Sequence, residues 1–332
     1  MPLYLLLVPL LFLGQDSKFS TDVKVVNVLA TVHDKKGQIF SNLTKEDFAI
    51  EEEGRPQVIQ YFSRETNLPL TLGLLVDTSM SQRRVIGDEQ RAAYRFVDQV
   101  MTQKDQTFVI HFDRDVELLQ DFTNSRQKLE RALSSLETPL QLHRGQQGQS
   151  GSPGRRGGGG GTALYDAVLL ASNDVIRDEP GRKAVIVLSD GVDNGSRVGL
   201  SDAIQAAQRH DVLVYSILFS DEQAYGNGGM PPMRGGRGGG GRPHPNSMPR
   251  ADDGKKVLER LSMETGGGFF EVSKKQPLDR TFAQIQDELR NQYSLGFTSD
   301  QPASPGSFRR LLVTTPKQKN LTVQARDGYY AK

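Results

Sequence analysis

Residues 71–81 read Thr-Leu-Gly-Leu-Leu-Val-Asp-Thr-Ser-Met-Ser, and the run changes from apolar to polar at Asp77. A segment that is apolar on both faces is typical of a strand buried within a parallel sheet. The residues after such a strand lie at its carboxyl end, where open α/β sheets bind their ligands. Asp77, Ser79 and Ser81 therefore bring a carboxylate and two hydroxyls to this edge. These hard oxygen donors suit Mg²⁺, Ca²⁺ or Mn²⁺ better than zinc.

Two later residues belong to the same pattern. Thr162 stands in Gly-Thr-Ala-Leu-Tyr-Asp-Ala at the mouth of a predicted helix, and Asp190 stands in Val-Leu-Ser-Asp-Gly at the end of another buried strand. Asp77-x-Ser79-x-Ser81 resembles the metal-ion-dependent adhesion motif of von Willebrand factor A domains, which also takes a Thr and an Asp from two later loops. The resemblance implies that Ser79 and Ser81 bind the metal directly. It also implies that Thr162 binds directly or through water, and that Asp77 and Asp190 act mostly through bridging waters.

A site of this kind predicts a binding function. Neutral hydroxyls leave much of the charge of a Mg²⁺ ion unneutralised, so an Asp or Glu carboxylate of a partner protein can supply the missing oxygen. We therefore expect an exported, metal-dependent, adhesion-type protein-binding module that uses Mg²⁺, with Mn²⁺ or Ca²⁺ as alternatives. In the structural alternative, Ser79 and Ser81 only cap the next helix, and the chain is a metal-free scaffold in an envelope assembly.

A further alternative is a metal-dependent phosphohydrolase with Asp77 as its nucleophile. That class usually has a second carboxylate two residues later, where this chain has Ser79. The 5 histidines show no metal-ligand spacing, and Ser-Asp-Gly at 189–191 is not a nucleophile elbow. We therefore predict that the chain is not an enzyme.

Predicted strands and helices alternate around this stretch. Apolar residues at helical spacing predict a helix near residues 86–100 and a last amphipathic helix through Leu278, Phe282, Ile285 and Leu289. Buried strands are predicted at 108–112, 184–188 and 212–219, with an antiparallel edge strand at 116–119. The order predicts an α/β fold with a doubly wound, mostly parallel sheet.

The two ends of the chain are instead predicted to be rich in β-strands. Strands are predicted at residues 22–32, 48–50 and 58–62, the last two around a turn at 53–56, and again at 293–297, 309–313 and 321–325. We infer that these strands form one small β-module beside the sheet. The phrases at 43–48, 61–65, 292–293 and 325–330 resemble a bacterial group of exported VWFA-related proteins, so the likeness covers nearly the whole ordered chain.

The remaining segments concern location and partners. The apolar run at residues 3–13 is too short for a spanning helix and fits a secretory signal, although no Lys or Arg precedes it. A buried element or a membrane anchor is the alternative. Inserts at about 141–161 and 224–250 are Gly- and Arg-rich, and we expect disorder there. Their arginines could capture an acidic partner, or the inserts could simply be tolerated loops.

Composition and these patterns give the expected organisation. A net charge of +1 gives no steering toward nucleic acid or membrane, and 0 cysteines exclude disulfides and Cys-based zinc sites. The glycines at 157–161 lack the strand and Lys of a phosphate loop, so no nucleotide is expected. Arg-Gly-Gly segments also occur in RNA-binding tails, but an exported protein rarely meets RNA, so no nucleic acid is expected either. We expect a secreted, periplasmic or cell-envelope protein. Its parts would be 1–17 (signal or anchor), 18–67 (β region), 68–292 (A domain) and 293–332 (β region).

Overall fold

The computed structural model describes residues 25–65, 68–82, 85–136, 161–219, 251–273, 276–301 and 304–331. Its larger sheet has six strands in the order β10-β9-β8-β5-β6-β7, and every neighbouring pair is parallel except β6 with β7. The predicted mostly parallel α/β sheet with an antiparallel edge strand is confirmed. The strands are β5 (Leu70–Asp77), β6 (Gln106–Phe112), β7 (Val116–Thr123), β8 (Arg182–Ser189), β9 (Val212–Leu218) and β10 (Phe269–Glu271).

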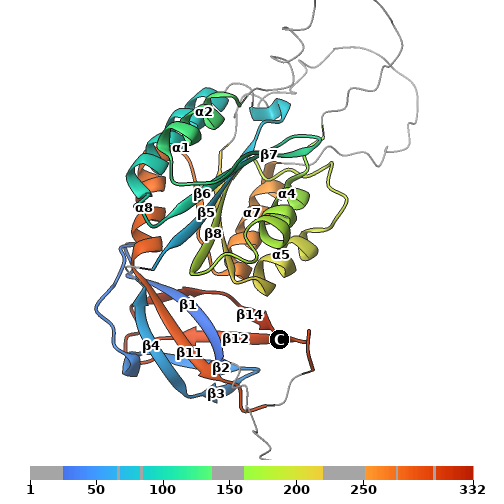
Figure 1. The fold of residues 1–332 in the computed structure, drawn as a ribbon. Helices are drawn as coiled ribbons and strands as arrows, with labels where there is room; N and C mark the ends of the chain where they lie inside the picture. Colours follow the sequence, from blue (N-terminus) through green and yellow to red (C-terminus); the bar gives the residue numbers. More distant parts are fainter. Residues whose placement is uncertain are drawn as a thin grey trace, which may run out of the picture.

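Helices cover both faces of this sheet, which explains why the central strands are apolar throughout (Figure 1). All eight residues of β5 are buried. Gly73 interrupts the large side chains of β5 because a Cβ there would lie 2.4 Å from the Phe108 ring of β6. One face carries α1 (Ile86–Val100), α2 (Arg126–Ser134) and α8 (Leu278–Arg290). The other carries α4 (Leu164–Leu170), which continues into a π-helical turn at Ala171–Val175, together with α5 (Leu200–Arg209) and α7 (Ala251–Thr265).

The N- and C-terminal strands join into two small antiparallel sheets, as the sequence predicts. One has the order β13-β1-β11-β4 and the other β14-β12-β2-β3, and they share one apolar core. Strand β1 pairs with β11 from Val25 opposite Thr298 to Ala30 opposite Tyr293. The strands are β1 (Val25–His33), β2 (Ala49–Glu52), β3 (Arg55–Gln57), β4 (Ile59–Glu65), β11 (Gln292–Thr298), β12 (Phe308–Thr314), β13 (Thr322–Ala325) and β14 (Gly328–Tyr330).

The sequence predicts strands at 48–50 and 58–62 around a turn at 53–56, but the structure has an additional strand, β3, where the second half of that turn was expected. Strand β2 instead forms its hairpin with β3, and β4 belongs to the other small sheet. The turn has two residues, Glu53 with φ 49° and Gly54 with φ 75°. Positive φ at both positions is typical of the tight turn that closes a hairpin immediately, so the partner strand starts at Arg55 rather than beyond Pro56.

The small sheets adjoin the amino ends of the large sheet. Strand β11 begins at Gln292, directly after α8 ends at Arg290. A pocket of about 350 Å³ is lined both by Arg182 and Val212, which begin β8 and β9, and by Asn27 of β1. Because the strands are parallel, their carboxyl ends lie at the opposite end of the sheet, away from the small sheets (Figure 1).

Three sequence-based expectations lie outside the described residues. These are the signal or anchor at 1–17, the disordered insert at 141–161 apart from Gly161, and the insert at 224–250. Among the helices that the structure describes, none is long and apolar enough to cross a membrane.

Candidate metal centre

Asp77 is the last residue of β5, and two hydrogen bonds fix its fully buried carboxylate. The backbone N–H of Ser79 donates to Oδ1 at 2.9 Å, and the hydroxyl of Ser189 donates to Oδ2 at 2.6 Å. The Ser189 hydroxyl in turn accepts the backbone N–H of Gly191 at 3.0 Å. Ser189 therefore links the carboxyl ends of β5 and β8. Ser189 was not identified from the sequence, where its position next to Asp190 was the only hint of a role at this site.

The hydroxyls of Ser79 and Ser81 lie beside each other, with Oγ atoms 3.0 Å apart. A short 3₁₀ turn, η2 (Met80–Gln82), brings them together, and the N–H of Gln82 donates to the carbonyl of Ser79 at 3.0 Å. Helix α1 begins later, at Ile86, and its N-terminus has no side-chain cap. The two hydroxyls are therefore not caps of that helix.

Asp190 follows β8 at the same edge of the sheet and is 2 % exposed. Its Oδ1 accepts the N–H of Val192 at 3.0 Å. Gly191 has φ 77°, and a Cβ there would lie 2.2 Å from the carbonyl oxygen of Gly254 in α7. The backbone of α7 thus packs directly on the Asp190 loop, and glycine is required at Gly191 by both conformation and space.

Thr162 reaches this edge through backbone contacts. The N–H of Ala163 donates at 2.7 Å to the carbonyl of Asp113, the first residue after β6. The N–H of Thr162 donates to Oδ1 of Asn194 at 2.7 Å, and the carbonyl of Thr162 accepts the N–H of Gly195 at 3.0 Å. The loop after β8 thus holds the start of the α4 segment beside β6, the neighbour of β5. Asn194 and Asp113 were not singled out from the sequence.

Like charges gather around Asp77. Burial raises the pKa of Asp77, and the charge of Asp190 raises it further, against the hydrogen bonds from Ser189 and Ser79. Glu89, in the first turn of α1, is fully buried as well. Its pKa is raised well above the usual range by burial and then by the charges of Asp77 and Asp190. The sequence analysis did not identify Glu89.

The five predicted residues offer only oxygen donors, three hydroxyls and two carboxylates. Within the described part of the chain there is no group of three or more His, Asp or Glu side chains placed to hold a metal ion. Any cation at this edge would therefore depend on the hydroxyls of Ser79, Ser81 and Thr162 as well as on carboxylates. Such a donor set has the chemistry of a hard divalent cation such as Mg²⁺.

Comparison with known proteins found one matching sequence family and several similar solved structures. Residues 72–192 match the sequence family described as von Willebrand factor type A domain. An aerotolerance-related membrane protein from Bacteroides fragilis is 18% identical, with 66% of this chain and 98% of that chain covered and a TM-score of 0.44. A von Willebrand factor type A protein from Catenulispora acidiphila is 12% identical, with 82% and 72% covered and a TM-score of 0.45.

A third similar structure is that of proximal thread matrix protein 1 from the mussel byssus, solved with a zinc-occupied MIDAS motif. It is 14% identical, with 73% of this chain and 50% of that chain covered and a TM-score of 0.44. No curated protein matches the sequence.

Proposed function

Since this chain is a von Willebrand factor type A (VWA) domain protein, we propose that it is an exported, non-catalytic binding module with one divalent-cation site. The site consists of Asp77, Ser79, Ser81, Thr162 and Asp190. Its ion is Mg²⁺, with Mn²⁺ or Ca²⁺ as alternatives. The partner is a protein that offers an Asp or Glu carboxylate.

The observation that carries the proposal is the spacing of the two serine hydroxyls. Mg²⁺ binds six oxygens in a near-ideal octahedron at about 2.1 Å, which places neighbouring ligands about 3 Å apart. The Oγ atoms of Ser79 and Ser81 are 3.0 Å apart, and Ser79 also donates its N–H to the buried Asp77. The spacing supports these two serines as neighbouring ligands of one ion.

The charges around the site support a carboxylate as the partner group. When bound, the cation would supply an electrostatic contact to an oxygen of the partner. Ser79 and Ser81 would donate neutral oxygens, whereas Asp77 and Asp190 are fixed by hydrogen bonds from the backbone of Ser79 and Val192. Because the direct ligands carry no charge, a partner carboxylate adds an anionic ligand that the chain itself does not provide.

The proposed location rests on the sequence alone. The apolar run at residues 3–13 has the length and composition of a secretory signal core, so we propose a secreted, periplasmic or cell-envelope protein. Cell fractionation with an antibody against the folded domain tests this proposal. Recovery in the cytoplasmic fraction alone would contradict it.

Calorimetric titration of MgCl₂, MnCl₂ and CaCl₂ into the chain tests the metal site. The wild type should bind one ion, and Ser79→Ala and Asp190→Ala should abolish binding. Ser294→Ala is the matched control, because that hydroxyl lies on β11 in the small sheets, where it donates to Asn27. A folded wild type that binds no ion at millimolar concentration would exclude this function and favour the metal-free scaffold.

A further inference from the structure

Two buried polar side chains next to the proposed metal site have no hydrogen-bond partner among the residues that the structure describes. Glu89 and Gln82 are each 0% exposed. Both carboxylate oxygens of Glu89 and both polar side-chain atoms of Gln82 lack a partner within the described part of the chain. Buried polar groups in folded proteins nearly always have one, often an ordered water or an ion. A group bound from outside the chain would satisfy these four atoms.

The chain places both side chains close to the metal site. Gln82 ends the 3₁₀ turn that carries Ser81, and its N–H donates to the carbonyl of Ser79. Glu89 follows in the first turn of α1. The charges that act most strongly on Glu89 are those of Asp77 and Asp190, ahead of Asp88, its neighbour in the chain. The buried Glu89 carboxyl is therefore within electrostatic reach of the two aspartates at the carboxyl end of the sheet.

A packing role does not account for Glu89. The buried residues that follow it on α1 are apolar and contribute to the core, among them Ala92, Ala93 and Phe96. An apolar residue at position 89 would fill the same space without the desolvation that a buried carboxyl suffers. The carboxyl also faces two like charges, which adds to the cost. Positive charge from a bound cation would offset both the desolvation of the carboxyl and its repulsion by the two aspartates.

We propose that Glu89 is a positioning residue of the cation site, which acts on the ion through Asp77 and Asp190 while the Gln82 amide binds the intervening water. The inference rests on the proposed function and deepens it. Groups behind the direct ligands orient them and tune the affinity for the metal. The negative charge of Glu89 behind the ligands also favours divalent over monovalent cations, because attraction scales with the charge of the ion.

The test compares Glu89→Gln with Glu288→Gln in the full chain. Glu288 is a matched control because it is a second buried glutamate with a raised pKa, but it lies on α8 beside Gln324 of the small sheets. Titration with MgCl₂ should show affinity about 10- to 100-fold weaker for Glu89→Gln and unchanged for Glu288→Gln. Glu89→Asp, which keeps the charge, should bind Mg²⁺ more tightly than Glu89→Gln.

Thermal unfolding in EDTA separates this role from a structural one. Glu89→Gln should unfold at the same temperature as wild type or higher, because it replaces a buried carboxyl that has no hydrogen-bond partner among the described residues, while the shift caused by added Mg²⁺ should shrink. Wild-type affinity in Glu89→Gln, an equal loss in Glu288→Gln, or equal affinity of Glu89→Gln and Glu89→Asp would each overturn the proposal. If the wild type itself binds no ion, the proposed function fails together with this inference. If the wild type binds and Asp190→Ala abolishes binding, the proposed function stands whatever Glu89 does.

Discussion

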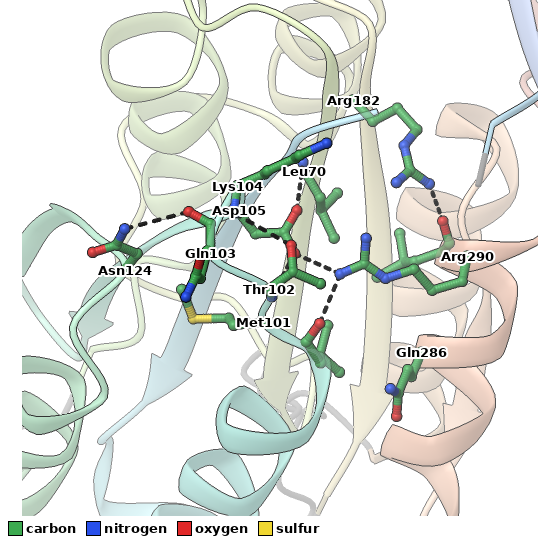
Figure 2. Close-up of polar contacts among 12 residues, drawn as sticks. Leu70, Met101, Thr102, Gln103, Lys104, Asp105, Asn124, Arg182, Gln286 and Arg290 are labelled. Carbon is green, nitrogen blue, oxygen red and sulfur yellow. Dashed lines mark hydrogen bonds and ion pairs between the residues drawn. The ribbon is translucent and has the colours of Figure 1, made fainter. Parts of the chain in front are cut away.

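The two ends of the large sheet each bury an aspartate, Asp105 just before β6 and Asp77 at the end of β5. Asp105 accepts hydrogen bonds from the N–H of Leu70 at 2.9 Å, from the N–H and hydroxyl of Thr102 at 2.8 Å each, and from the guanidinium of Arg290 (Figure 2). Within the described ranges, Asp77 accepts its hydrogen bonds from neutral donors, the backbone of Ser79 and the hydroxyl of Ser189.

The pKa values of these two buried aspartates are shifted in opposite directions. Burial alone would raise the pKa of Asp105, but the hydrogen bonds from Arg290, Thr102 and Leu70 outweigh it and lower the pKa. Burial and the charge of Asp190 raise the pKa of Asp77. The chain therefore neutralises its carboxylate at the amino end and leaves like charges together at the carboxyl end. We infer that the first arrangement serves stability, and that the second depends on positive charge from outside the chain.

Substitution of Asp105 should give the largest effect and tests the stability half of this comparison. Asp105→Ala would leave Arg290 without its buried partner and two backbone N–H groups unsatisfied. We expect a loss of about 3–5 kcal/mol in the free energy of unfolding, measured by denaturant titration. The affinity of the remaining folded protein for Mg²⁺ should not change.

Asp98→Ala is the control for this experiment, because Asp98 pairs with Arg126 where both side chains are about half exposed, at 50% and 54%. It should change the free energy of unfolding by less than about 1 kcal/mol. A comparably small effect of Asp105→Ala would remove the contrast between the two ends of the sheet.

Another buried carboxyl, that of Glu288 on α8, should make the free energy of unfolding depend on pH. This effect should be similar to or smaller than that of Asp105→Ala. Burial raises the pKa of Glu288 from 4.5 to about 7, against hydrogen bonds such as that from Gln324 at 3.1 Å. The folded state thus holds a proton that the unfolded chain releases above pH 4.5. Its contribution to stability is complete below pH 4.5 and is lost as the pH rises through about 7.

Glu288→Gln should remove this dependence, because glutamine stays neutral. Denaturant titrations at pH 5 and pH 7 should show that wild type loses about 2 kcal/mol more than the variant over this range. Glu271→Gln, whose side chain is 53% exposed beside Lys255, should behave as wild type. Parallel pH profiles of wild type and Glu288→Gln would show that burial of this carboxyl does not affect stability in the way that we infer.

The sequence predicted the carboxyl end of the sheet better than the amino end. Asp77 ends one largely apolar strand and Asp190 follows another, so a local pattern was enough to place them on one edge. Asp105 and Arg290 are 185 residues apart, and no local pattern pairs them. Glu89 was missed because an acid in the first helical turn is usually exposed, and only packing of α1 on the sheet buries it.

The smallest expected effect concerns Ser189, whose hydroxyl holds the Asp77 carboxylate at 2.6 Å. Ser189→Ala should weaken Mg²⁺ binding about 10-fold, because it frees one oxygen of Asp77 from its fixed position. It should cost only about 1 kcal/mol of unfolding free energy. Ser216→Ala on β9 is the matched control, since this buried hydroxyl has no hydrogen-bond partner among the residues described by the structure. Calorimetry measures the Mg²⁺ affinity of both variants, and denaturant titration measures their free energy of unfolding. If Ser216→Ala weakens Mg²⁺ binding as much as Ser189→Ala does, the fixed orientation of Asp77 is not what prepares the carboxyl end for an ion.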